Sequence, residues 1–243
     1  MIQTAVILAA GLGSRLKEKT KLQPKGFLEL ENNSLIKRSI DNLLSCGIEN
    51  IYIGTGYLSE VYEKFALDYS GITCIKSDQY KTTSSMYTLY NMKHKLKEDF
   101  LLLESDLLYE VDALRILLND NINDIILSSG QTNSEDEVYI QTDKKQNLVK
   151  MSKQKENLTT VNSELVGISK ISQNRFKMMC TAFENQNNPK IDYEYIMVQT
   201  AKLSPFNVKK IENLIWCEID DENHLNRALN TILPKIKAKY EEN

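Results

Sequence analysis

The residues best suited to chemistry lie at the start of the chain, which reads MIQTAVILAAGLGSRLKEKTKLQPKGF. Gly11 and Gly13 follow directly after an apolar run, in a chain with only nine glycines among 243 residues. A glycine turn of this kind offers backbone N–H groups at close approach, and Arg15 adds a fixed positive charge. Pro24 and Lys25 follow after that arginine. We therefore expect this loop to bind a polyphosphate.

Three interpretations of the glycine loop compete. A dinucleotide-binding turn requires GxGxxG, but Leu16 stands where the third glycine belongs. A P-loop requires GxxxxGK followed by serine or threonine, and the loop lacks that pattern. The third interpretation is a tight turn whose glycines serve geometry alone. A strand followed by GxG does not by itself separate that turn from a phosphate site.

Carboxylates suited to a metal follow a later apolar run. The stretch FLLLESDLLYE places Asp106 just past the carboxyl end of a buried strand, with Glu104 two residues earlier. Phosphoryl-type transfer uses Mg²⁺ held by one or two carboxylates together with phosphate oxygens and water. Asp106 is therefore a candidate metal ligand, and Glu104 could face the same way.

The elements that must position these residues alternate along the first half of the chain. Apolar strand-like runs cover residues 4–10, 50–56, 72–77 and 100–105, and helix-like segments cover residues 35–44, 59–69 and 82–96. Each crossover is long enough for a right-handed βαβ unit. The pattern predicts an α/β fold with a Rossmann-like, doubly wound, mostly parallel mixed sheet.

The second half of the chain has a different pattern. Short strands at close spacing over residues 125–172 indicate a small antiparallel acceptor or lid subregion. Two helices should follow, then a strand near LIWCEI and a last helix that Pro234 should bend. We expect one domain over residues 1–243. Its parts would be a nucleotide-binding core at 1–130, an acceptor and lid region at 131–205, and a C-terminal metal-site strand and helix at 206–243.

Composition excludes several classes of protein. The net charge of −3 argues against bulk nucleic-acid or membrane-surface binding. No apolar stretch approaches 18 residues and no basic segment precedes ILAA, so we expect neither a membrane span nor a signal peptide. We therefore expect a soluble cytoplasmic protein.

The four scattered cysteines favour free thiols. His94 and His224 have no partners at zinc-ligand spacing and are expected at the surface.

The complete N-terminal motif is more specific than its parts. It resembles the LAAGxGxR…T…PK signature of the nucleotidyltransferases that activate sugars and alcohols with nucleoside triphosphates, with Thr20 at the threonine position and Glu18 where many relatives carry proline. The resemblance implies that the backbone of residues 11–14, together with Arg15, holds the β- and γ-phosphates. It also implies that Lys25 contacts the α-phosphate and stabilises the transition state.

The family also carries a second metal-binding aspartate near its C-terminus. In the stretch WCEIDDENHL, Asp220 is the best match to it. Asp221 is the alternative, although Asp221 could instead cap the final helix. The resemblance therefore implies Mg²⁺ as cofactor, with Asp106 and Asp220 as its ligands.

Nearly the whole chain is similar to the small cytidylyltransferases of this GT-A-like superfamily. It resembles those that activate phosphocholine, and more closely their phosphonate-specific relatives, which make CMP-2-aminoethylphosphonate. Some of those relatives are fused to an aminotransferase, so a fusion partner is also conceivable here. The resemblance implies a cytidine nucleotide site formed by Leu8, Ala10, Gly11, Leu12, Gly13, Ser14, Arg15, Gly56, Tyr57, Ser84 and Ser85. Ser84 and Ser85 could equally cap a helix, and both roles can hold at once.

The acceptor stays open between two amines. A quaternary ammonium favours an aromatic cage, which Tyr139, Tyr193 and Tyr195 could partly supply, whereas a primary ammonium favours carboxylates. Region 131–205 is acid-rich, with Glu135, Asp136, Glu137, Asp192 and Glu194. The helical spacing of Asp192 and Glu194 predicts that only one of them points inward.

Family analogy places the acceptor phosphonate on Lys153, with Lys150 as the other candidate. The acceptor-binding residues expected are then Lys153, Asp192, Glu194 and Tyr139. The expected reaction joins CTP and 2-aminoethylphosphonate to give CMP-2-aminoethylphosphonate and pyrophosphate. CTP:phosphocholine cytidylyl transfer is the alternative, and a non-catalytic nucleotide-binding regulator is an alternative of another class.

Overall fold

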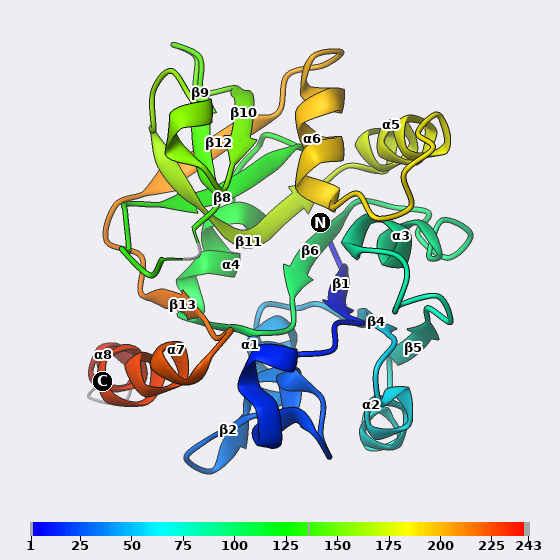
Figure 1. Ribbon diagram of the computed structural model, residues 1–243, viewed down its shortest axis with the longest axis vertical. Helices are drawn as coiled ribbons and strands as arrows, with labels where there is room; N and C mark the ends of the chain where they lie inside the picture. The colour runs from blue at the N-terminus through cyan, green and yellow to red at the C-terminus, as the bar shows by residue number, and fades with distance from the viewer. Residues whose placement is uncertain (1, 136, 241–243) are drawn as a thin grey trace.

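The computed structural model describes residues 2–135 and 137–240, so Asp136 of the expected acidic group lies outside the described residues. Its centre is strand β1 (Thr4–Ala9), whose six residues are all buried. Strand β1 pairs in parallel with β4 (Asn50–Thr55) on one side and with β6 (Phe100–Glu104) on the other, and β5 (Ile72–Lys76) pairs in parallel with β4. Parallel pairing brings the carboxyl ends of these strands to one edge of the sheet (Figure 1).

Beyond β6 the direction of the sheet reverses. Strand β11 (Ser163–Ile171) pairs antiparallel with β6, β8 (Ile125–Ser129) and β9 (Tyr139–Thr142), and β10 (Leu148–Ser152) pairs antiparallel with β9. Strand β12 (Asn207–Ile211) pairs in parallel with β8. Among the described residues these strands make one nine-stranded sheet. The predicted α/β fold with a mixed sheet and a small antiparallel part is confirmed.

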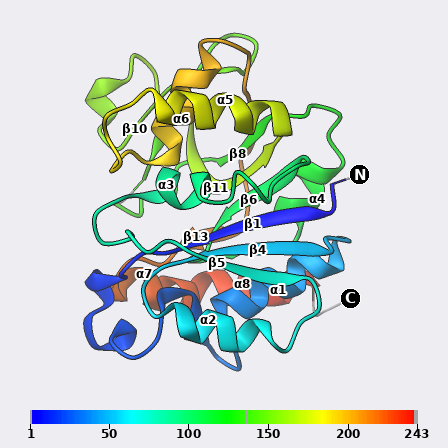
Figure 2. The same ribbon diagram turned by 90° about the vertical axis from the view of Figure 1, so that its right-hand side faces the viewer.

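Helices cover both faces of the sheet (Figure 2). One face packs on α1 (Leu35–Ser45), α2 (Ser59–Ala66) and α4 (Asp112–Leu118), and the other packs on α3 (Ser85–Tyr90), α5 (Gln173–Glu184) and α6 (Tyr193–Ala201). Alternate residues of β1 serve the two faces: Ile7 belongs to the first cluster and Val6 to the second. The helix expected over residues 82–96 is shorter than predicted and continues as turns.

The C-terminal segment returns to the carboxyl edge of the sheet. Strand β13 (Trp216–Glu218) pairs antiparallel with β7 (Leu107–Tyr109), which follows β6 directly. Helix α7 (Glu222–Arg227) leads through a π-helical turn at Ala228–Ile232 into α8 (Leu233–Tyr240). Pro234 lacks an N–H and its ring crowds the carbonyl four residues earlier, which lies in this turn, so the expected interruption is present.

The remaining elements are short. The two-residue strands β2 (Glu29–Leu30) and β3 (Asn33–Ser34) form a hairpin, and 3₁₀ turns lie at Ser14–Thr20, Lys25–Phe27 and Lys155–Asn157. All four cysteines are free thiols. Within the part of the chain that the structure describes, every helix is too short or too polar to cross a membrane.

Candidate active site

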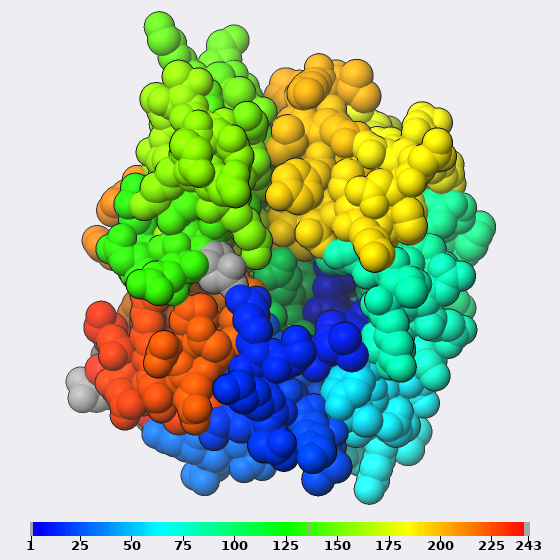
Figure 3. Space-filling view, viewed as in Figure 1, coloured from blue at the N-terminus to red at the C-terminus, as the bar shows by residue number. Residues whose placement is uncertain are grey.

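A cleft of about 410 Å³ opens at the carboxyl edge of β1 and β6. Figure 3 shows it as a hollow between the blue N-terminal loop, the teal segment and the yellow-to-orange segment that carries α6. Its lining combines the loop after β1, Lys25, the start of α3, the end of β6, and residues from α6 and β13. The edge where parallel strands end is where open α/β sheets bind ligands.

The glycine loop has a defined shape. Gly13 has φ +61°, and Thr20 Oγ1 donates a 2.8 Å hydrogen bond to the Gly13 carbonyl. A Cβ at Gly13 would lie only 3.2 Å from the Thr20 methyl group, so glycine suits the position for two reasons. A Cβ at Gly11 would meet nothing within 4 Å. The open side of the loop therefore faces the cleft, where a ligand can approach the backbone.

Lys25 lies at the centre of the ion pairs in the cleft. Its Nζ is 2.6 Å from Asp106 Oδ2 and also bonds to Asp220 Oδ1, while Arg15 pairs with Asp220 at 2.8 Å. Burial alone would lower the pKa of the Lys25 ammonium, but the carboxylates of Asp106 and Asp220 outweigh it and raise that pKa. Four residues predicted from sequence are thus brought together, with a positive charge held where the loop meets the acids.

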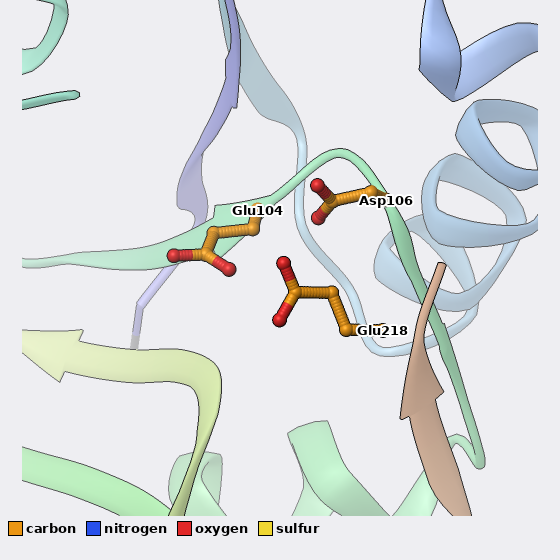
Figure 4. A group of neighbouring side chains, drawn as sticks. All are labelled: Glu104, Asp106 and Glu218. Carbon is orange, nitrogen blue, oxygen red and sulfur yellow. The ribbon is translucent and has the colours of Figure 1, made fainter. Parts of the chain in front are cut away.

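Three carboxylates that could hold a metal converge at the end of β6, and the expected pair Asp106 and Asp220 stays a prediction. Oxygens of Glu104, Asp106 and Glu218 lie within 4.8 Å of one another, and Figure 4 shows the three side chains converging from β6, the turn after it and β13. Asp106 Oδ1 is buried with no hydrogen-bond partner among the described residues. Such a set of hard oxygen donors with an unused oxygen fits Mg²⁺. Asp220 instead bonds to Lys25 and Arg15 and lies outside this three-membered cluster.

The cluster carries an electrostatic cost without a cation. Burial, followed by the charge of Asp106, raises the pKa of both Glu104 and Glu218 well above the ordinary range. Sequence reasoning named Glu104 as a neighbour of Asp106 but missed Glu218. The signal was available: Glu218 and Asp220 are two apart at the end of a strand, so their side chains leave on the same side.

Gly167 leaves room for the carboxyl group of Glu104 because it has no side chain. It lies in β11 at φ +81°, where the pairing of β11 with β8 shifts register. A Cβ there would come within 2.8 Å of Glu104 Oε2. Tyr193 fixes the other oxygen of the same carboxyl group by donating a 2.7 Å hydrogen bond to Oε1. The position of this carboxylate is therefore set from two sides.

Ser84 and Ser85 lie at the start of α3 and contact Asp192, the N-cap residue of α6. Ser84 Oγ bonds to Asp192 Oδ1, and Ser85 Oγ lies 3.2 Å from the same oxygen. Ser84 stands at the N-cap of α3, but its hydroxyl bonds to Asp192 and not to a helical N–H. Side-chain capping is therefore not the role that Ser84 has in this structure.

Asp192 and Glu194 both line the cleft, so the expectation that only one points inward is wrong. Asp192 is the extended N-cap of α6, with φ −80° and ψ 154°, and Glu194 lies in its first turn. The helical spacing rule applies only where both residues are helical. Lys153 lines the same cleft, whereas Lys150 Nζ donates to the Asn157 carbonyl at 2.6 Å.

Glu104 and Glu218 of this carboxylate cluster also line a smaller chamber of about 60 Å³, which we call the back chamber. Its polar and aromatic lining includes Glu104, Thr132, Ser134, Glu137, Lys153, Glu164, Glu194, Trp216, Glu218 and Arg227. The Glu164 carboxylate accepts two hydrogen bonds from Thr132, one from its N–H at 2.7 Å and one from its hydroxyl at 2.6 Å. Glu194 Oε2, in contrast, is buried without a hydrogen-bond partner among the described residues. Burial first, and then the charge of Asp192, raises the pKa of Glu194 to about 7.

Two predicted tyrosines lie elsewhere. Tyr57 donates a 3.0 Å hydrogen bond to the Lys21 carbonyl, and Tyr80 lines the cleft in its place. A Cβ at Gly56 would come within 2.6 Å of Tyr80 Cβ, so Gly56 seats that ring without lining the cleft itself. Tyr139 donates to Glu137 at 2.9 Å and lines neither the cleft nor the back chamber.

The start of α7 contains Asp221 and His224, two residues that the sequence analysis considered. Asp221 is the N-cap of α7 and accepts a 2.9 Å hydrogen bond from the His224 backbone N–H. His224 is buried, so its expected surface position is wrong. The Asp220 N–H lies 3.3 Å from His224 Nδ1, and His224 Nε2 lies 2.8 Å from the Ser134 carbonyl. Because only tertiary contacts bury this ring, no local sequence pattern indicates its burial.

The sequence matches the model of the MobA-like NTP transferase domain over residues 5–155. It is 33% identical over 121 residues to the CTP:phosphoglutamine cytidylyltransferase of Campylobacter jejuni, covering 47% of this chain and 48% of that protein. It is 35% identical over 98 residues to the choline-phosphate cytidylyltransferase of Streptococcus pneumoniae, covering 40% of this chain and 42% of that protein. The chain thus spans about half the length, or slightly less, of these curated relatives.

A further relative is the 2-aminoethylphosphonate cytidylyltransferase of Lancefieldella rimae, 29% identical over 86 residues, which are 35% of each chain. Among solved structures, the inositol-1-phosphate CTP transferase from T. maritima superposes with a TM-score of 0.82 at 20% identity. That superposition covers 97% of this chain and 96% of the other. At this identity the similarity supports the fold alone.

Proposed function

Because the chain belongs to the family of MobA-like NTP transferases, we propose that it is a Mg²⁺-dependent cytidylyltransferase. The proposed reaction converts CTP and 2-aminoethylphosphonate to CMP-2-aminoethylphosphonate and pyrophosphate. One observation carries the proposal. A single cleft joins the glycine loop and Lys25 on one side to a converging set of carboxylates and to Lys153 on the other. That arrangement suits the joining of a nucleoside triphosphate to a small charged acceptor.

The proposed reaction needs positioning and charge neutralisation. An acceptor oxygen forms a bond to the α-phosphorus of CTP, the bond from that phosphorus to the bridging oxygen breaks, and pyrophosphate leaves in line with the incoming oxygen. The N–H groups of residues 11–14 and Arg15 would hold the β- and γ-phosphates. The ammonium of Lys25 would contact the α-phosphoryl group and stabilise the negative charge that develops there in the transition state.

Glu104, Asp106 and Glu218 would hold Mg²⁺, which supplies Lewis-acid stabilisation of the phosphoryl oxygens when bound. Asp220 has a different proposed role. Through its contacts with Lys25 and Arg15 it would orient the two cations that meet the triphosphate. Removal of either carboxylate at Lys25 would leave that ammonium less well placed.

The acceptor end of the proposal depends on charge. Glu194 Oε2 is buried and has no hydrogen-bond partner among residues 2–135 and 137–240, Asp192 lies beside it, and Lys153 lines the same walls. An ammonium would complete the hydrogen bonding of Glu194 and stabilise its charged form, while Lys153 would meet the anionic end of the acceptor. These contacts suit a short zwitterion with a phosphonate or phosphate at one end and an amine at the other.

A second acceptor is favoured by a separate observation. Trp216 lines the back chamber and so brings an aromatic side chain near the acidic lining. A quaternary ammonium binds well against an aromatic face. Phosphocholine is therefore the second candidate, in agreement with the name of the pneumococcal relative.

Pyrophosphate release from CTP, UTP, ATP or GTP with Mg²⁺ tests the proposal, with one acceptor added at a time. The acceptors are 2-aminoethylphosphonate, phosphocholine, phosphoethanolamine, phosphoglutamine and glucose 1-phosphate. We expect the highest kcat/KM with CTP and 2-aminoethylphosphonate. A preference for phosphocholine or phosphoglutamine would overturn the acceptor assignment, and turnover with UTP alone would overturn the nucleotide assignment. CTP binding without turnover of any acceptor would instead support a nucleotide-binding regulator.

A further inference from the structure

We propose that His224 is a positioning residue that ties the nucleotide side of the cleft to the wall of the back chamber. The inference rests on the proposed function, because it assigns this ring an effect on two different kinetic constants. Among the described residues, the ring of His224 bonds to Asp220 and Ser134 and not to the glycine loop, so its effect passes through those two residues.

The hydrogen bonds fix the state of the ring. The Asp220 backbone N–H can only donate, so His224 Nδ1 accepts at 3.3 Å. The Ser134 carbonyl can only accept, so Nε2 carries the proton and donates at 2.8 Å. Asp221 Oδ1 lies 3.9 Å from Nδ1, beyond hydrogen-bond distance. The geometry therefore assigns the donor role to Nε2 and the acceptor role to Nδ1.

One nitrogen of the ring acts on the nucleotide side. Asp220 presents its carboxylate to Lys25 and Arg15, and its backbone N–H is anchored on Nδ1. A shift of that backbone moves the carboxylate that holds the proposed catalytic lysine. A small misplacement of such a group affects the chemical step more than it affects binding.

The other nitrogen acts on the acceptor side. Ser134 belongs to the back chamber wall, and its N–H donates to Glu137 Oε1 at 2.7 Å. Its hydroxyl also lies 3.2 Å from that of Thr132, which holds Glu164. The Nε2 bond therefore anchors a wall segment that carries several of the polar groups facing the chamber.

The helix itself does not need the imidazole. Asp221 already caps α7, and Leu225 and Ala228 already pack in the core beneath it. Both ring nitrogens bond to backbone atoms outside the helix, namely those of Asp220 and Ser134. The ring thus links two segments 86 residues apart in sequence, from Ser134 to Asp220.

Two conservative variants separate the two bonds. In His224→Asn the amide oxygen lies at the position of Nδ1 and can accept from Asp220, but the side chain is too short to reach Ser134. In His224→Gln the amide nitrogen lies near the position of Nε2 and can donate to Ser134, while the acceptor for Asp220 is lost. The exposed His94→Asn is the control, since His94 lies outside both cavities.

We expect His224→Asn to raise the acceptor KM, and His224→Gln to lower kcat, each by roughly 3- to 10-fold, the range that the loss of one hydrogen bond gives. The other constant should stay within about twofold in each variant, on the same scale of hydrogen-bond energies. Nitrogen-15 chemical shifts of the wild-type imidazole should report the proton on Nε2. Thermal unfolding of both variants checks that they are folded.

The results separate this inference from the proposed function. Absence of wild-type turnover with every acceptor overturns the proposed function. Wild-type turnover with both variants unchanged, or with both changing the same constant, overturns the positioning role of His224. Imidazole nitrogen shifts that place the proton on Nδ1 overturn it as well.

Discussion

The two sides of the cleft are built differently. The nucleotide side is a continuous backbone turn after β1, in which Gly11 and Gly13 leave room for a ligand. The acceptor side is made of carboxylates and a lysine from β6, α6, β13 and the segment after β10, which are far apart in sequence. The first side presents backbone dipoles and the buried cation of Lys25, whereas the second buries several like charges in one place.

The two sides should therefore respond differently to substitution. Backbone N–H groups tolerate most side-chain substitutions around them, so the sensitive point on the nucleotide side is the fixed cation. On the acceptor side each carboxylate influences its neighbours, since burial and mutual repulsion raise the pKa values of Glu104, Glu194 and Glu218. Substitutions there should alter specificity, stability and pH dependence together.

The largest effect is expected at the cation. Lys25→Ala should lower kcat for pyrophosphate release by on the order of 10²-fold or more, because the ammonium would act on charge that develops in the transition state. Lys21→Ala is the matched control, since Lys21 lies in the same loop region and its exposed side chain pairs with Glu18. A near-normal rate in Lys25→Ala would remove this residue from the proposed chemistry.

The next effect is expected on the acceptor side. Glu194→Gln should raise the KM for 2-aminoethylphosphonate by about 10- to 100-fold, as the loss of a charged hydrogen bond predicts, and should leave the KM for CTP within about twofold. Steady-state kinetics with each substrate varied in turn measure both constants. Equal increases in both KM values would mean that Glu194 affects CTP binding as much as acceptor binding, so the cleft would not have two separate sides.

Gly167 and Gly47 test how closely the acceptor side is packed. Both have φ +81°, but a Cβ at Gly47 meets nothing within 4 Å, whereas one at Gly167 meets Glu104 at 2.8 Å. Gly47→Ala should therefore cost only the backbone strain of about 1–2 kcal/mol in unfolding free energy. Gly167→Ala should cost more and also lower kcat, because Glu104 must move. Equal stability losses with unchanged activity in both variants would contradict this account.

The charge of Glu194 predicts a pH dependence of stability in the protein without metal or substrate. A carboxyl group whose pKa is raised on folding contributes stability at pH values below its ordinary pKa of 4.5. That contribution is lost as the pH rises through the folded-state pKa of about 7. Glu194→Gln should therefore gain stability relative to the wild type between pH 5 and pH 8. Urea unfolding at both pH values, with EDTA present, measures the difference. Parallel pH profiles would show that Glu194 is not buried in this way.

The smallest effect is expected just outside the cleft. Asp221→Ala should destabilise the protein by about 1 kcal/mol through loss of the α7 N-cap, with kcat unchanged. Thermal unfolding and the pyrophosphate assay measure the two quantities. A large loss of kcat would return Asp221 to the candidates for the site and would weaken the assignment of Asp220.

Sequence reasoning did best where the site is continuous. The alternation of strands and helices predicted the fold, and the loop from Gly11 to Lys25 could be read directly because neighbouring residues define its shape. It placed Asp106 by the rule that strand ends meet at one edge. It did worse where segments meet through tertiary packing: Glu218 and Tyr80 were missed, His224 was placed at the surface, and Tyr57 and Tyr139 were placed in a site that they do not line. The roles of the predicted residues remain predictions.

The two carboxylates at Lys25 also show how little sequence distance matters to stability. Asp106 is 81 residues from Lys25 and Asp220 is 195 residues away. By chain statistics, closing the longer loop costs only about 0.8 kcal/mol more than closing the shorter one, because the entropy depends on the logarithm of loop length. A catalytic centre can therefore draw a residue from almost the far end of a polypeptide for less free energy than one helix cap provides. The larger consequence is kinetic, since such distant contacts slow the search for the native topology.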